Sequence, residues 1–158
     1  VRSEHPAAVP EGAPSPALSP SEVVLREKLE AAMAGGYYRT AGLSITGLAA
    51  HLGTPEHRLR ALINQRMGHR NFSAFLNRYR IAEAKAILAD RARVDLPVLT
   101  VAMDLGYNSL PPFNRAFRSE TGTTPSDFRR QCFGEHHGFV RMLFVQLTTV
   151  PPPRHDPA

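Results

Sequence analysis

The amino-acid sequence predicts an all-α domain in which two helix-turn-helix units are joined by a long helix. Three observations lead to this fold class. Apolar residues recur at helical spacing between residues that typically cap and stop helices. One helix-turn-helix pattern occurs twice along the chain, about 53 residues apart. No segment of residues 19–131 alternates apolar and polar side chains as a strand does.

The first predicted helix has clear boundaries. Ser19 supplies a cap, Pro20 suits the first turn, and Glu22 completes a capping box. The glycine pair at 35–36 ends the helix. Residues 1–18, rich in proline and alanine, are predicted to be a disordered linker. The predicted apolar face of the helix consists of Val24, Leu25, Leu29, Ala32 and Met33.

The first helix-turn-helix unit follows. A short helix over residues 45–52, capped by Ser44, precedes a helix over residues 55–67, capped by Thr54. A long helix over residues 72–89 then leads to the second unit. The predicted buried residues of the 55–67 helix are Leu59, Leu62, Ile63 and Met67. The predicted apolar stripe of the long helix is Phe72, Phe75, Leu76, Tyr79, Ala82, Ala86 and Ile87.

The second unit has the same plan. Pro97 opens a short helix that ends at Gly106, and Ser109 caps a helix that reaches Thr121. A last helix starts at Thr124, where the run Thr-Pro-Ser-Asp has a capping-box pattern.

The internal repeat is the strongest evidence for this architecture. Each unit has a small residue where its two helices approach closely, Ala49 or Ala102, and a glycine in the turn, Gly53 or Gly106, where the backbone needs a positive φ. A helical bundle that uses such hairpins only for packing is the alternative, but the Arg, Asn or His side chains on the predicted exposed faces of both second helices argue against it. The matched pairs are Ile45/Val98, Leu48/Val101, Ala49/Ala102, Leu52/Leu105, Gly53/Gly106, Leu59/Phe113, Ile63/Phe117, Gly68/Gly122, Ser73/Ser126 and Phe75/Phe128.

Composition limits the classes of function. Residues 37–131 carry 14 Arg and Lys, 13 of them Arg, against seven Asp and Glu, so this block has a net charge of +7 and favours a polyanionic partner. The single cysteine, Cys132, excludes a disulfide within one chain and fits a reducing cytoplasm. No Ser/His/Asp grouping, glycine-rich phosphate loop or metal-ligand spacing is present in the sequence. We therefore predict no enzyme activity, cofactor or metal.

Three sequence runs carry a family resemblance. They are FLNRYRI at 75–81, LGYNS at 105–109, and FNRAFR at 113–118 with TGTTPSDFR at 121–129. Together they resemble the DNA-binding domain of the AraC family over residues 37–131. The resemblance implies seven helices and one recognition helix per unit, each entering the major groove on one face of double-stranded DNA. It also implies transcription regulation in the bacterial cytoplasm, usually activation through RNA polymerase. Many relatives place a sensor or dimerisation domain N-terminal to this module, and some place a membrane-spanning one there.

Candidate DNA contacts come from both recognition helices. In the first unit the family's base-contacting positions correspond to His57, Arg60 and Ala61, and Arg58 and Asn64 are further candidates. Arg60 suits guanine and Asn64 suits adenine. In the second unit the family resemblance makes Arg115 the best-matched contact, beside Asn114, and Arg118 is predicted to contact phosphate. The start of that helix, Ser109, Leu110 and Pro111, offers few side-chain donors, so we expect the first unit to carry more hydrogen-bond specificity.

Phosphate contacts and domain limits complete the expectations. Backbone amides near Ser44 and Ser109 are candidate phosphate sites. Arg39, Arg58, Arg66 and Arg70 are either phosphate contacts or solvated charges. The DNA-binding domain is predicted over 19–131 and a tail over 132–158, whose apolar stretch 139–150 has no predicted role. Two alternatives remain, a DNA-targeting module of an enzyme and an architectural DNA binder without sequence preference.

Overall fold

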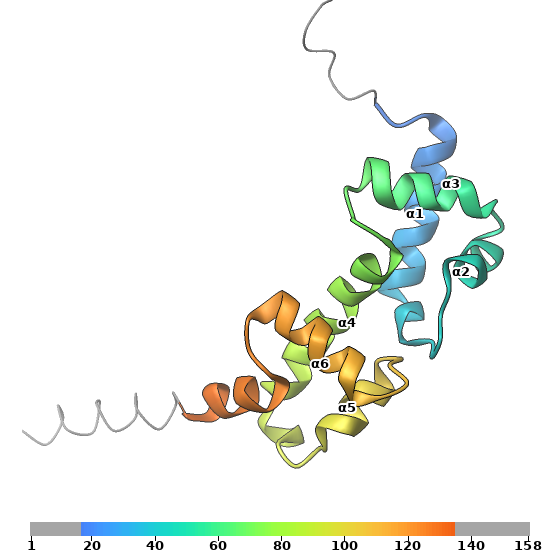
Figure 1. The fold of residues 1–158 in the computed structure, drawn as a ribbon. Coiled ribbons are helices and arrows are strands. Elements are labelled where there is room, and N and C mark those ends of the chain that lie inside the picture. The colour runs from blue at the N-terminus through green and yellow to red at the C-terminus, as the bar shows by residue number, and fades with distance from the viewer. Residues whose placement is uncertain (1–16, 135–158) are drawn as a thin grey trace, which may run out of the picture.

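The computed structural model describes residues 17–134, and every regular element in that part of the chain is helical. Two groups of helices lie at the two ends of the long helix α4 (Figure 1). Residues 125–134 form a further helix, so the described residues contain seven helices besides the short 3-10 turns η1 and η3, when α3 and its π-helical continuation η2 count as one. The named elements are α1 (Pro20–Ala34), η1 (Tyr37–Arg39), α2 (Ile45–Leu52), α3 (Glu56–Ala61), η2 (Leu62–Arg66), α4 (Phe72–Leu88), η3 (Arg91–Arg93), α5 (Val98–Asp104) and α6 (Leu110–Thr121).

Most helix starts confirm the predicted caps. The Ser19 capping box is complete, because the Ser19 hydroxyl accepts from the Glu22 amide at 3.3 Å and the Glu22 carboxylate accepts from the Ser19 amide at 2.7 Å. The Ser44 hydroxyl accepts from the Gly47 amide at 3.0 Å. The hydroxyl of Thr124 likewise accepts from the Asp127 amide at 3.2 Å.

Of the other two predicted caps, one is wrong and one is right in position only. Thr54 does not cap α3, because the helix begins at Glu56 and Pro55 occupies the cap position without a side-chain bond. Ser109 occupies the cap position of α6 but its hydroxyl makes no capping hydrogen bond. The second and third positions of α6 are prolines, which have no N–H for the hydroxyl to accept from.

The repeat is confirmed by burial. Two hydrophobic cores form, one around α1 to the first half of α4 and one around the second half of α4 to α6. We call these the first unit and the second unit. Matched residues such as Leu48 and Val101, or Leu59 and Phe113, have no exposed surface in either unit. The turn glycines also match, with φ of 67° at Gly53 and 95° at Gly106.

The long helix buries different faces at its two ends. Its first half places Phe75 and Leu76 in the first core. Its second half places a different set of residues in the second core, and the predicted stripe is wrong there because Ala82 and Ala86 are exposed. At about 100° per residue, the two buried faces lie roughly 140° apart around the axis of α4. The second set is Ile81, Ala84, Ile87 and Leu88.

Residues just outside the predicted domain bounds also take part in the described structure. Leu18, at the end of the predicted linker, packs against the first core, and the last helix continues through residues 132–134 of the predicted tail. On α1, Val24 is 51% exposed rather than buried. The rest of the predicted linker and the apolar stretch 139–150 lie outside the described residues. No helix among residues 17–134 is long and apolar enough to cross a membrane.

Candidate nucleic-acid interface

The two recognition helices present matching sets of four positions. On α3 and its continuation, His57, Arg60, Ala61 and Asn64 follow the i, i+3, i+4, i+7 spacing that places residues on one helix face. The same spacing on α6, 54 residues later, gives Pro111, Asn114, Arg115 and Arg118. The opposite faces of both helices lie in the cores, so these sets face away from the cores.

One acidic side chain of the first recognition helix pairs with a predicted DNA contact. Glu56 accepts a hydrogen bond from the Thr46 hydroxyl of α2 at 2.7 Å and also pairs with Arg60 one turn further along. The bond from Thr46, and then the pair with Arg60, hold the pKa of the Glu56 carboxyl below its ordinary value. The Arg60 side chain is 54% exposed, so this ion pair is weak and is easily exchanged for another partner. Glu56 therefore orients the Arg60 guanidinium without burying it.

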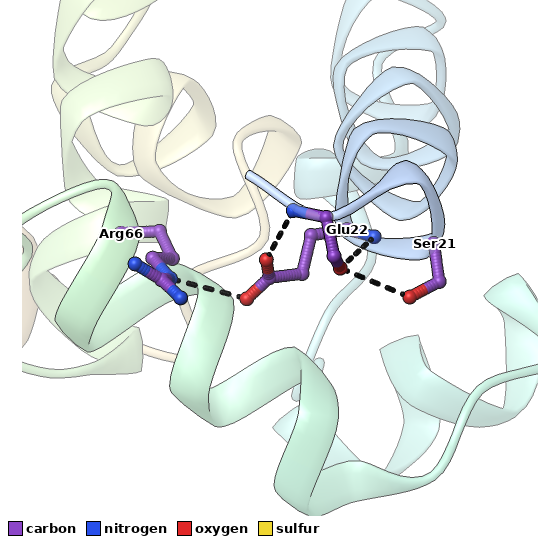
Figure 2. Close-up of polar contacts among 4 residues, drawn as sticks. Ser21, Glu22 and Arg66 are labelled. Atoms are coloured by element: carbon purple, nitrogen blue, oxygen red, sulfur yellow. Dashed lines mark hydrogen bonds and ion pairs between the residues drawn. The ribbon is translucent and has the colours of Figure 1, made fainter. Parts of the chain in front are cut away.

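The start of α1 lies beside the first recognition helix. His57, Arg58 and Ala61 line a groove of about 460 Å³ whose other wall is the first turn of α1. Across one end of this groove the Glu22 carboxylate accepts from the Arg66 Nε at 3.1 Å (Figure 2). The Ser19 amide is the main cause of a lowered pKa at Glu22, and Arg66 adds to it. The capping box of α1 and the end of the recognition helix are thus tied together by one carboxylate.

The end of the first recognition helix differs from the predicted regular α-helix. Residues 62–66 form a π-helical turn, in which the Met67 amide donates to the Leu62 carbonyl at 2.9 Å. Asn64 lies inside this turn and is half-buried, as is Ala61 just before it. Arg60, Arg58 and His57 are the exposed members of the predicted set.

The second recognition helix is more open. Ser109, Pro111, Asn114, Arg115 and Arg118 are all exposed, and none of its arginines has an ion pair within residues 17–134. Leu110 is different, because it packs against the second core.

The candidate phosphate contacts divide into two groups. Arg39 pairs with Glu83 at 2.7 Å and Arg66 pairs with Glu22, so both have structural partners. Arg58 and Arg70 are exposed and have no ion pair in the described part of the chain. At the helix starts, the amides near Ser44 remain candidates.

The α6 start is a poor phosphate site. The residues at its second and third positions, Pro111 and Pro112, lack the amide hydrogens that bind anions at helix N-termini. The two prolines leave only the amides of Ser109 and Leu110 to bind a phosphate there, so the contact near Ser109 stays a weaker prediction than the one near Ser44.

Two acidic residues beside the interface were missed as site residues. The Glu56–Arg60 pair has the i, i+4 spacing that stabilises helices, so the sequence contained its signal. The Glu22–Arg66 pair joins residues 44 positions apart and has no local signal. Among residues 17–134 no group of three His, Cys, Asp or Glu side chains is arranged to hold a metal ion.

Comparisons with known proteins match this geometry. Residues 48–131 match a family described as a helix-turn-helix domain. The arabinose operon regulatory protein of Salmonella typhimurium is 32% identical over 88 residues, covering 56% of this chain and 30% of that protein. The regulatory protein SoxS of the same organism is 36% identical over 63 residues, covering 40% of this chain and 56% of that protein.

A solved structure shares the fold. The C-terminal domain of AraT, a response regulator from Geobacillus stearothermophilus, superposes with a TM-score of 0.58 and 24% identity, covering 72% of this chain and 87% of that domain. The chain spans about a third of the arabinose regulator and about half of SoxS. Both curated relatives are named as regulators, so the comparisons do not favour the alternative of an enzyme module.

Proposed function

Because this chain belongs to the AraC family of DNA-binding transcription regulators, we propose that its two recognition helices contact one double-stranded DNA site at two successive major-groove segments. The segments lie about one helical turn apart, at roughly 34 Å. The proposed contacts are His57, Arg58, Arg60, Ala61 and Asn64 in the first unit, and Ser109, Pro111, Asn114, Arg115 and Arg118 in the second.

One observation carries this proposal. The four-position faces of α3 and α6 repeat at matching places in two units whose cores also match. Exposed Arg, Asn and His side chains on these faces supply donors for guanine, adenine and phosphate. An architectural binder without sequence preference would not need Asn and His on the faces that we propose to meet base edges.

The regulatory role follows from the family. We propose that the chain is the DNA-binding part of a longer bacterial regulator that acts in the cytoplasm, activates transcription through RNA polymerase, and has a sensor or dimerisation domain before residue 19. The first turn of α1 borders the recognition helix groove, so a domain attached there would be close to the DNA.

The proposal is tested by selecting binding sites from random duplexes and footprinting the selected site. The expected result is one motif with two half-sites about ten base pairs apart, protected on one face of the duplex. Affinity should fall steeply with salt, because each phosphate contact contributes about −0.9 to the log–log slope. Selection of no motif, or protection of a single groove segment, would contradict the proposal.

A further inference from the structure

A buried arginine lies where the two units meet. Among the residues that the structure describes, Arg80 in the middle of α4 is the only charged residue that is buried, with 7% of its surface exposed. An unpaired buried guanidinium is unfavourable, so its hydrogen-bond partners indicate what it holds together. Those partners come from both units.

The first unit supplies two carbonyl oxygens. The Arg80 Nε donates to the Tyr38 carbonyl at 2.8 Å, and its Nη2 donates to the Thr40 carbonyl at 3.1 Å. The same segment is fixed a second time by Glu83, one turn along α4, which accepts from the Tyr38 hydroxyl and pairs with Arg39 at 2.7 Å. Residues 38–40 are therefore tied to the centre of α4 at several points.

The second unit supplies a ring and a close backbone contact. The Arg80 guanidinium lies 5.0 Å from the centre of the Tyr107 ring, which is a cation–π distance. The Tyr107 hydroxyl donates to Asn77 of α4 at 2.7 Å. At Gly106, the residue before Tyr107, an added Cβ would lie 2.8 Å from both the Arg39 carbonyl oxygen and the Arg80 Nη2. The turn of the second unit thus touches the backbone of the first unit at a residue without a side chain.

The two units are not joined by a shared hydrophobic core, so the polar contacts around Arg80 are not duplicated by apolar packing. The two hydrophobic cores share no residue, and the last buried residue of one, Leu76, precedes the first of the other, Ile81. A cavity of about 240 Å³ lies beside Arg80, with Leu43 of the first unit and Pro112 of the second on its walls. The relative orientation of the units therefore depends on α4 and on the polar contacts around its centre, of which those of Arg80 reach both units.

We propose that Arg80 is a positioning residue that fixes the spacing and tilt between the two recognition helices, and so makes the protein selective for half-site spacing. This inference rests on the proposed function. A rigid connection raises the effective concentration of the second unit at its half-site, whereas a loose connection lowers it and tolerates altered spacing. Arg80 is buried between the units and lies outside both recognition helices, so we expect its effect on the pair of half-sites and not on either one.

The test compares full sites with single half-sites. The Arg80→Met variant keeps most of the side-chain volume and loses the donors. We expect its affinity for the full site to fall about tenfold while its affinity for an isolated half-site stays within about twofold of the original chain. Inserting one base pair between the half-sites should also reduce the affinity of Arg80→Met by less than it reduces that of the parent chain. Arg78→Met is the matched control, because Arg78 is an exposed arginine on the same helix, and it should preserve the spacing preference.

A second measurement needs no DNA and keeps the proposal separate from the proposed function. Spin labels at Ala50→Cys and Glu120→Cys, in a Cys132→Ser background, report the distance between the units, and both positions are exposed. The distance distribution should be narrow in the parent and Arg78→Met chains and broad in Arg80→Met. If Arg80→Met fails to fold, Tyr107→Phe takes its place, because this variant loses only the hydroxyl bond to Asn77. Tyr107→Phe should broaden the distance distribution to a smaller extent.

Two outcomes would overturn the proposal. One is an equal loss of affinity for half-sites and full sites in Arg80→Met, which would mean a general structural role. The other is an unchanged distance distribution and spacing preference in a folded variant. A narrow distribution that broadens in Arg80→Met, in a chain that selects no DNA motif, would support the junction and contradict only the proposed function.

Discussion

The two units have nearly the same interior and different recognition surfaces. Matched positions such as Leu48 and Val101 are buried in both units, whereas the four matched surface positions carry His, Arg, Ala and Asn in the first unit and Pro, Asn, Arg and Arg in the second. At the offset of 54 residues, Arg60 matches Asn114, and the arginine of the second unit, Arg115, lies one position later. The surroundings differ as well, because Arg60 pairs with Glu56 and Arg115 has no ion pair in the described part of the chain. A repeated scaffold therefore holds two surfaces with separate chemistry.

The largest expected effect is that of Arg60→Ala. A bidentate arginine–guanine contact is worth roughly 1–3 kcal/mol, so this variant should lose that much affinity and relax preference at one base pair. Binding-site selection with the variant measures both. An unchanged motif would assign base recognition in the first unit to other residues.

The next prediction compares the two cap serines. Ser44→Ala should lower the free energy of unfolding by about 1 kcal/mol, because its hydroxyl caps α2 by accepting from the Gly47 amide. Ser109→Ala should leave stability almost unchanged, because its hydroxyl makes no capping bond. Urea denaturation of both variants makes the comparison. Equal losses would contradict the different roles of the two serines.

A third variant, Arg118→Ala, separates phosphate contact from base recognition. Loss of a phosphate contact should weaken all sequences by a similar factor and reduce the magnitude of the salt slope by about 1. Titrations at several salt concentrations, with the selected site and with random DNA, provide the measurement. A change in selected motif would instead place Arg118 at a base edge.

The smallest effect is expected for Pro111→Ala. Pro111 is exposed and has no side-chain donor, so base preference should change little. The selected motif of this variant should overlay that of the parent chain. A rewritten second half-site would show that the proline ring itself contacts a base, and would reverse the expectation that the first unit carries more specificity.

Local signals predicted the fold well, and long-range contacts account for what they missed. Caps such as Ser19 and turn glycines such as Gly53 act within a few residues, so the sequence places them. On α4, Ala84 is buried and Ala82 is exposed, because the second unit packs on the face that carries Ala84. The helical spacing of apolar residues in the sequence does not show which face that is. Arg80 is a similar case, because its carbonyl partners lie 40 and 42 residues earlier in the chain.

The candidate site follows the same division. The i, i+3, i+4, i+7 sets were visible in the sequence, since helix geometry alone puts them on one face. The half-burial of Asn64 was not visible, because it follows from the π-helical turn over residues 62–66. Leu110 looked like a surface residue at a helix start, and only the packing of the second core shows where it lies.

The rotated faces of α4 restrict how the chain can tolerate insertions and deletions. One residue added between Leu76 and Ile81 would turn everything that follows by about 100° and expose an apolar face. Seven added residues come back to within about 20° of the original phase and lengthen the helix by roughly 10 Å. Insertions in α4 should therefore be tolerated only in multiples of about seven residues. Each such insertion would require a different separation of half-sites. The loop around Asp95 is where single-residue changes in length should be tolerated.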